Sequence, residues 1–191
     1  MLMKASVIFN LVIVLFTAAA VRKHIMAAGV KQVLRYYTTQ SNLLCAFAAL
    51  LVLLCRLSGS VPEWVLVLKH VGTVAVALTM LTVLLYLGPA YRNYKDLLSG
   101  PSFFLHLFCP LVAIVSRLAW DRPKGGFETV LLGALPALLY GLFYFQKVVL
   151  APPEKRWEDF YKFNIDGKWP LSAVSVIGGC LIISLGIWLL G

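Results

Sequence analysis

The stretch Val33–Leu54, VLRYYTTQSNLLCAFAALLVLL, decides the fold class because it joins a membrane-length apolar run to a polar entry. Five polar residues, Thr38 to Asn42, occupy the start of this run. The hydrocarbon core of a bilayer offers no hydrogen-bond partner, so each unpartnered hydroxyl or amide there costs several kcal/mol. The stretch therefore predicts a transmembrane helix whose polar residues either contact other helices or form part of a functional site.

The composition extends this prediction to the whole chain of 191 residues. Hydrophobic residues make up 61% of it and charged residues 13%, and the mean hydropathy is +0.87, whereas a soluble domain of this size carries far more charge. Apolar runs separated by Gly- and Pro-containing segments predict an all-α integral membrane protein, a single bundle of six transmembrane helices formed by residues 1–191 as one domain. We expect the spans at about 5–21, 36–55, 65–87, 103–119, 130–150 and 171–190.

The positions of the basic residues predict the orientation of the bundle. The net charge is +9, from 17 Lys and Arg against 8 Asp and Glu. These basic residues flank the apolar runs, which indicates contact with lipid headgroups and argues against nucleic acid as a partner. Eleven of the 17 fall in the first, third and fifth loops: Arg22, Lys23, Lys31, Arg35, Arg92, Lys95, Lys147, Lys155, Arg156, Lys162 and Lys168. The positive-inside rule then places these three loops in the cytoplasm and both termini outside the cell membrane.

The four cysteines give no sign of a disulfide framework or a metal site. Cys45, Cys55, Cys109 and Cys180 all lie inside apolar runs, and no two of them form a CxxC pair. Buried cysteine usually behaves as a small hydrophobic residue. We therefore expect no metal ion and no cofactor.

The polar stretch of the second span supports two interpretations. At about 100° per residue, Thr38, Ser41 and Asn42 share one helix face, and Thr39 and Gln40 flank it. Such residues commonly form hydrogen bonds between transmembrane helices or cap the start of a helix. Polar clusters inside a membrane also mark functional sites.

His106, in the sequence PSFFLHLFCPL, strengthens the functional interpretation. It lies about four residues into the fourth span and Thr38 about two residues into the second, so at ~1.5 Å per residue their depths agree within roughly 3–5 Å. A hydroxyl and an imidazole at one depth suggest a nucleophile and its base, and Asn42, one turn deeper, is a candidate donor to an oxyanion. Cys109 shares the helix face of His106 and is a rival nucleophile, although an apolar environment disfavours a thiolate.

The fifth loop, APPEKRWEDFYKFNIDGKWP at 151–170, is longer than a simple connection needs to be. One interpretation is a lid over a site at this side of the membrane; the other is an amphipathic segment in the headgroup region. The residues that we expect to line a lid or pocket are Tyr144, Gln146, Asp166 and Trp169.

The motifs YYTTQSNLL and LHLFCPL, about 65 residues apart, resemble the bacterial branch of the androgen-induced-gene and androgen-dependent TFPI-regulating protein family. That branch typically has F-F-T-x-Q-S-N-L-L on one helix and H-x-x-x-P on another, and the segment FYKFNIDGKWPLSAVSVIGG also resembles its last part. The animal members are six-helix proteins that hydrolyse fatty acid esters of hydroxy fatty acids with a threonine and a histidine. The resemblance therefore implies Thr38, or alternatively Thr39, as nucleophile and His106 as base. Ser116 stands where the branch usually has a carboxylate, and His106 stands one residue closer to its proline than in the animal enzymes.

Two functions follow as expectations. The first is an intramembrane lipid esterase with a fatty acid ester as substrate, in which Thr38 attacks the ester carbonyl, His106 moves the proton, and Gln40, Ser41 and Asn42 stabilise the oxyanion. The alternative is a membrane protein that binds or transports a lipid or small molecule without turnover, with the polar cluster as its pocket. An enzyme loses turnover when either Thr38 or His106 is replaced, whereas a binding protein loses affinity.

Overall fold

The computed structural model describes residues 2–191, with side chains from Lys4 onward, and within that range it contains helices and connecting turns but no strand. Six segments are long and apolar enough to cross a membrane: Lys4–Ala28, Tyr37–Leu57, Glu63–Tyr91, Gly100–Ala119, Phe127–Leu150 and Trp169–Leu190. The all-α fold class with six membrane-spanning helices is thereby confirmed.

The long helices are α1 (Leu2–Ala28), α3 (Tyr37–Leu57), α4 (Glu63–Thr82), α8 (Cys109–Ala119), α9 (Phe127–Phe145) and α10 (Trp169–Leu190). The short helices are α2 (Val30–Val33), α5 (Gly88–Tyr91), α6 (Tyr94–Leu97), α7 (Gly100–Phe103), and the 3-10 turns η4 (Pro153–Lys155) and η5 (Ile165–Gly167). The largest difference from the expected spans is in α1, which continues through Arg22 and Lys23 and ends before Gly29. Gly29 has a φ of 79°, a conformation that glycine adopts at little cost.

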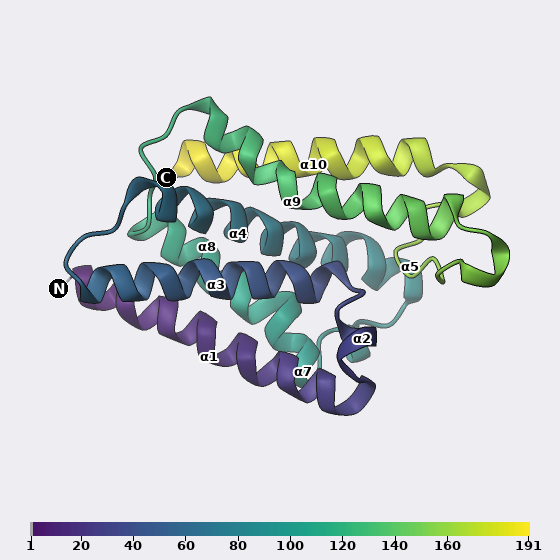
Figure 1. Ribbon diagram of the computed structural model, residues 1–191, viewed down its shortest axis with the longest axis horizontal. Coiled ribbons are helices and arrows are strands. Elements are labelled where there is room, and N and C mark those ends of the chain that lie inside the picture. The colour runs from purple at the N-terminus through teal and green to yellow at the C-terminus, as the bar shows by residue number, and fades with distance from the viewer. Residues whose placement is uncertain (1) are drawn as a thin grey trace.

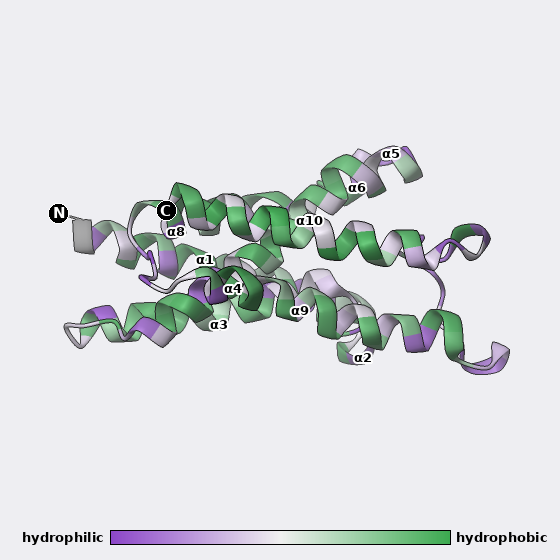
Figure 2. Cartoon of the chain, turned by 90° about the horizontal axis from the view of Figure 1, so that it is seen from above, coloured by the Kyte–Doolittle hydropathy of each residue, from purple (hydrophilic) through white to green (hydrophobic). Residues whose placement is uncertain are grey.

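Helix α4 forms the centre of the bundle. It packs against α3, α8, α9 and α10, and every residue from Gly72 to Met80 is buried. Figure 1 shows α1 and α3 on one side of α4 and α9 with α10 on the other. Hydrophobic residues cover the long helices, and hydrophilic residues gather toward the two ends of the bundle (Figure 2), as expected for a chain whose outer surface meets lipid.

The two ends of the bundle carry different loops. Both chain ends lie at one end, which we call the termini end, together with the loops that follow α3 and α8 (Figure 1). The loops after α1, after the π-helical turn η1 (Val83–Leu87) and after α9 lie at the other end, which we call the loop-five end. The odd-numbered loops thus share one end of the molecule, and the side of the membrane that this end faces stays a prediction.

Three of the spans contain one wider, π-helical turn, and all three turns lie toward the loop-five end: η1 (Val83–Leu87), η2 (Phe104–Phe108) and η3 (Gln146–Leu150). A proline follows each turn by two residues, at Pro89, Pro110 and Pro152. A proline has no N–H to donate to the carbonyl four residues earlier, and its ring crowds that carbonyl. Those carbonyls belong to the middle residues of the three turns, Leu85, His106 and Val148. The prolines therefore explain where the helices widen, a feature that is common at functional sites.

Helices α3 and α4 approach each other closely at Gly72. A Cβ atom at this position would lie 2.8 Å from the Cα of Cys45 on α3. Small residues at helix interfaces allow such backbone contact, which supplies van der Waals packing where the lipid provides no hydrophobic driving force.

Replacing Gly72 with alanine should therefore destabilise the bundle. The backbone of α3 has to move away from the new methyl group, and we expect a loss of about 1–3 kcal/mol in the free energy of unfolding. Gly186→Ala on α10 is the matched control, because no atom lies within 4 Å of a Cβ there. Unfolding of both variants in detergent measures the difference, and equal stabilities would contradict the close contact.

Candidate functional site

A cavity of about 630 Å³ lies at the loop-five end, between the start of α3, the α4–η1 segment, α9 and the first half of α10. Its walls are mainly aliphatic and aromatic. Hydroxyl groups are also present, on Thr38, Thr79, Thr82, Ser172 and Ser175, together with the tyrosines of α3 and α9. Lys162 and Lys168 of the fifth loop lie at its edge. The cavity thus combines apolar walls with a polar, positively charged end.

The fifth loop closes this end through Tyr161. The backbone N–H of Tyr37, the first residue of α3, donates to the Tyr161 hydroxyl at 2.9 Å, so a side chain from the loop caps the helix. The backbone N–H of Tyr161 donates to the Tyr144 hydroxyl at 3.2 Å, and that hydroxyl donates to Asp159. Burial raises the pKa of Tyr161 to about 12, so its phenol stays protonated at neutral pH.

Further contacts attach the loop to the neighbouring helices. Asp159 accepts the backbone N–H groups of Phe163 and Asn164 at 2.8 and 2.7 Å, which folds the loop into a compact turn. The Tyr91 hydroxyl donates to the carbonyl of Phe160 at 2.7 Å. The loop is therefore a packed roof over the cavity.

The four residues expected to form a lid or pocket lie in different places. Tyr144 is buried and lines the cavity. Gln146 and Asp166 are exposed, and Trp169 packs against Phe145 in a tilted arrangement with ring centroids 4.5 Å apart. These last three side chains do not line the cavity.

The five residues of the polar stretch of α3 make different contacts, and two of them bond to neighbouring helices. Ser41 shares a hydrogen bond of 2.9 Å with Thr79 on α4. Asn42 donates to the carbonyl of Leu105 in η2 at 3.0 Å and to the carbonyl of Thr38 at 2.8 Å. These two side chains join α3 to its neighbours, as polar residues at transmembrane interfaces commonly do.

The other three members of the stretch point elsewhere. Thr39 is buried, and exposed Gln40 donates to the carbonyl of Leu34 at 2.9 Å. Thr38 is the member that lines the large cavity. Gln40 and Ser41 border a separate, smaller groove.

His106 lies in η2, beside the third loop. Its Nδ1 is 2.6 Å from the carbonyl oxygen of Leu97. A carbonyl only accepts, so Nδ1 carries a proton and Nε2 is the free nitrogen of the neutral ring. Among the described residues no hydrogen bond joins His106 to Thr38, and His106 does not line the cavity. The two side chains stand on neighbouring segments that Asn42 connects.

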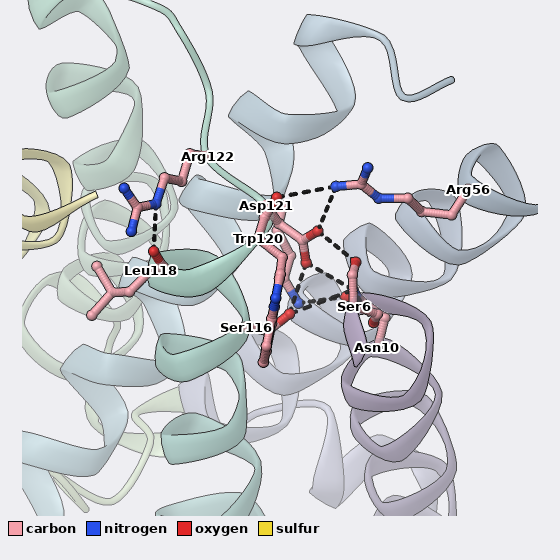
Figure 3. A network of polar contacts seen from close by, with 9 residues as sticks. Ser6, Asn10, Arg56, Ser116, Leu118, Trp120, Asp121 and Arg122 are labelled. Carbon is pink, nitrogen blue, oxygen red and sulfur yellow. Dashed lines mark hydrogen bonds and ion pairs between the residues drawn. The ribbon is translucent and has the colours of Figure 1, made fainter. Parts of the chain in front are cut away.

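A second polar cluster, centred on Asp121, lies at the termini end (Figure 3). Ser6 donates to Asp121 Oδ1 at 2.8 Å, whereas Asn10 and Ser116 donate to Oδ2 at 2.8 and 2.7 Å. Arg56 contacts Oδ1 at 3.3 Å. The carboxylate thus receives donors from α1, α3 and α8.

Lys69 of α4 completes the cluster. Its Nζ donates to Asn10 Oδ1 at 2.7 Å, so an amide links a buried ammonium group to a buried carboxylate. The side chains of Ser6, Asn10, Lys69, Ser116 and Asp121 are fully buried. We call these five residues and Arg56 the Asp121 network, and it ties together α1, α3, α4 and α8.

Sequence reasoning missed this network, although two signals were present. Ser6 and Asn10 stand four residues apart, on one face of an apolar helix, and Lys69 is a charged residue within a span. Ser116, which the family resemblance marks as a missing carboxylate, donates to the carboxylate of Asp121. Ser116, which holds that carboxylate, lies ten residues after His106 along the helix, about 15 Å away at ~1.5 Å per residue.

Comparison with known proteins finds no matching family model, and no curated protein or solved structure matches the chain. The resemblance to the androgen-induced-gene family therefore stays a prediction. Among the described residues, no group of three or more His, Cys, Asp or Glu side chains is placed to hold a metal ion.

Replacing Asp121 with alanine should strongly destabilise the protein, because it leaves buried hydroxyl and amide donors without their acceptor and the buried charge of Lys69 without its counter-charge. We expect a loss of about 3–5 kcal/mol, the usual cost of breaking a buried ion pair by removing one partner. Glu154→Ala, at an exposed position of η4, serves as the control. A thermal unfolding curve for each variant in detergent measures the effect, and wild-type stability of Asp121→Ala would show that the network does not hold the helices.

Proposed function

We propose that the protein binds a single-chain anionic amphiphile, such as a fatty acid, in the cavity at the loop-five end. The observation that carries this proposal is the cavity itself, about 630 Å³ in volume, with apolar walls and a positively charged edge. Ligand pockets commonly measure ~300–1,000 Å³ and combine apolar walls with a few polar groups. An acyl chain suits the walls, and an acidic headgroup suits the edge.

The polar end has to provide the selectivity. Lipid around the protein is as apolar as the cavity walls, so moving an acyl chain from the bilayer into the cavity gains little from the hydrophobic effect. Preference for one amphiphile over bulk lipid therefore depends on hydrogen bonds and charge at the headgroup.

Several groups are available for that headgroup. Lys168 is exposed and stands at the start of α10, whose N-terminal end attracts negative charge. Lys162 donates to the carbonyl of Ala90 at 3.3 Å and lies 4.5 Å from the centre of the Tyr91 ring, so its ammonium group is held at the edge. The Tyr37 hydroxyl is buried without a hydrogen-bond partner among the described residues, and Tyr37 lines the cavity. A carboxylate accepts hydrogen bonds both from ammonium groups and from a hydroxyl group.

Hydrolysis of a lipid ester in the same cavity is the second candidate function. The observation that favours it is the position of Thr38 on the cavity wall, one turn from Asn42, which bonds to the segment of His106. In that reaction the Thr38 hydroxyl attacks the ester carbonyl and its proton passes through His106 Nε2 to the leaving alcohol, after which water cleaves the acyl-threonine. The imidazole has to swing from Leu97 toward Thr38 for this step, and the wider turn η2 is the segment that would move.

Filling the cavity should weaken binding. Gly141 lines it, and no atom lies within 4 Å of a Cβ there, so Gly141→Leu places a side chain in open space without a clash. We expect the Kd for a fluorescent fatty acid to rise by about tenfold or more, which corresponds to ~1.4 kcal/mol. Gly186→Leu, equally uncrowded but outside the cavity lining, should bind like the wild type. Equal affinity in all three proteins would rule out this cavity as the binding site.

A fluorophosphonate probe separates binding from hydrolysis. If the chain is an esterase, mass spectrometry should find the probe on Thr38 or Thr39, and labelling should disappear in His106→Ala while fatty acid binding persists. If it only binds, the wild type stays unlabelled at probe concentrations that label a serine hydrolase control. Labelling that survives in His106→Ala would contradict the role of His106 as base.

A further inference from the structure

Arg117 of α8 is fully buried at the termini end, and its guanidinium group has no hydrogen-bond partner in the described part of the chain. Nε, Nη1 and Nη2 are all unpartnered among the described residues. Taking a guanidinium ion out of water without a counter-charge costs several kcal/mol, so buried arginines are almost always paired. Arg117 is therefore the least compensated group in the part of the chain that the structure describes.

A count of buried charges shows that the protein does not supply the missing partner. The fully buried ionised side chains are two cations, Lys69 and Arg117, and one anion, Asp121. Asp121 is already the acceptor for Arg56 and, through Asn10, the counter-charge of Lys69. Among the described residues, the fully buried side chains therefore carry one more positive than negative charge, and Glu63, which lies within electrostatic range of Arg117, accepts instead from the backbone N–H groups of Lys124 and Gly125.

Two further unpartnered atoms lie on the helices around Arg117. Thr129 Oγ1, in the first turn of α9, is buried without a partner. His70 of α4, whose ring is within electrostatic range of Arg117, has a buried and unpartnered Nδ1. Helix α4 packs against α8, α9 and α10, and α10 also contacts α8 and α9.

The hydrogen bonds of His70 determine which of its ring nitrogens is a donor and which is an acceptor. Ser184 donates its hydroxyl proton to the carbonyl of Val130 at 2.9 Å, so His70 Nε2, at 3.0 Å, is the donor to Ser184. A Cβ at Gly133 would lie 2.2 Å from Ser184 Oγ, so glycine at this position makes room for the contact. In the neutral ring, Nδ1 is then an unprotonated acceptor beside the guanidinium donors.

The C-terminal end of α10 lowers the free energy cost of burying Arg117, but part of that cost remains. The guanidinium packs against Gly191, just beyond the last turn of α10, where the helix dipole is negative. No backbone carbonyl there accepts a hydrogen bond from it, since all three nitrogens remain unpartnered among the described residues. The donors of Arg117 stay available.

We propose that Arg117 binds an oxyanion, a phosphate or carboxylate group, in a site completed by the Thr129 hydroxyl, where the unprotonated Nδ1 of His70 can accept only from a protonated oxygen of that group. The planar fork of a guanidinium matches two oxygens of such a group, and the hydroxyl adds a third donor. The ligand is either a free anion or the headgroup of an acidic lipid in this leaflet. The site lies at the opposite end of the bundle from the acyl cavity and does not depend on the function proposed for that cavity.

The test measures the melting temperature of the full chain in neutral phosphatidylcholine nanodiscs. One arm titrates inorganic phosphate against sodium chloride of equal ionic strength, and the other replaces part of the lipid with phosphatidic acid. A ligand that binds only the folded state raises the melting temperature in a saturable way. The variants are Arg117→Met, Arg117→Lys and, as an exposed cation at the same end, Arg122→Met.

We expect a saturable rise in the wild type and in Arg122→Met, and none in Arg117→Met. Arg117→Lys keeps the charge but not the planar fork of donors, so its half-saturation concentration should rise by about tenfold. If Arg117→Met does not fold, this shift in Arg117→Lys tests the proposal in its place. A rise with phosphate indicates a free anion, and a rise only with phosphatidic acid indicates a lipid headgroup. The proposal is overturned if neither ligand acts beyond sodium chloride, or if Arg117→Met or Arg117→Lys responds as the wild type does.

Discussion

The absence of hydrogen-bond partners in the bilayer core is the constraint on which this structure depends. A polar side chain within a span has to find its partner inside the protein or in a ligand. Ser41 and Asn42 bond to α4 and η2, and the Asp121 network joins helices whose residues lie more than a hundred positions apart in the chain. Such contacts select one arrangement of helices where the lipid itself gives little preference.

The groups left without partners mark the places where the protein has capacity to bind something. At the loop-five end they include the Tyr37 hydroxyl on the cavity wall, and two lysines stand at the edge of that cavity. At the termini end they are the guanidinium of Arg117 and the atoms near it. The two ends therefore differ in chemistry: one offers apolar volume with a positive edge, and the other offers a buried guanidinium group without a partner among the described residues.

The sequence was sufficient for the fold class and the spans, because hydrophobic length is a local property. It also located Thr38 and the fifth loop, since a polar run in a hydrophobic helix and a long aromatic loop are visible without the structure. Pro89 and Pro152 were visible too, within the segments that separate the spans, and Pro110 was visible within the motif LHLFCPL, but none of them predicted a wider turn.

Other features depend on contacts between distant segments. The position of Asp121 beside Ser6 and Asn10 has no local signal, and neither does the placement of Thr38 and His106 on different surfaces of neighbouring segments. The cavity also follows from tertiary structure, because α10 packs closely around Cys180 and Ser184 and exposes most of its first half. Periodicity along α10 does not distinguish these two halves.

Photocrosslinking is the most direct test of the central claim that the cavity holds an acyl chain. The wild-type protein in nanodiscs is irradiated with a fatty acid that carries a diazirine on its chain, and mass spectrometry maps the modified residues. We expect crosslinks concentrated on cavity residues such as Ala137, Gly141 and Val176. These crosslinks should disappear when an excess of unlabelled fatty acid competes for the cavity. Crosslinks spread evenly over lipid-facing residues such as Leu131, Leu142 and Ile182, without competition, would contradict it.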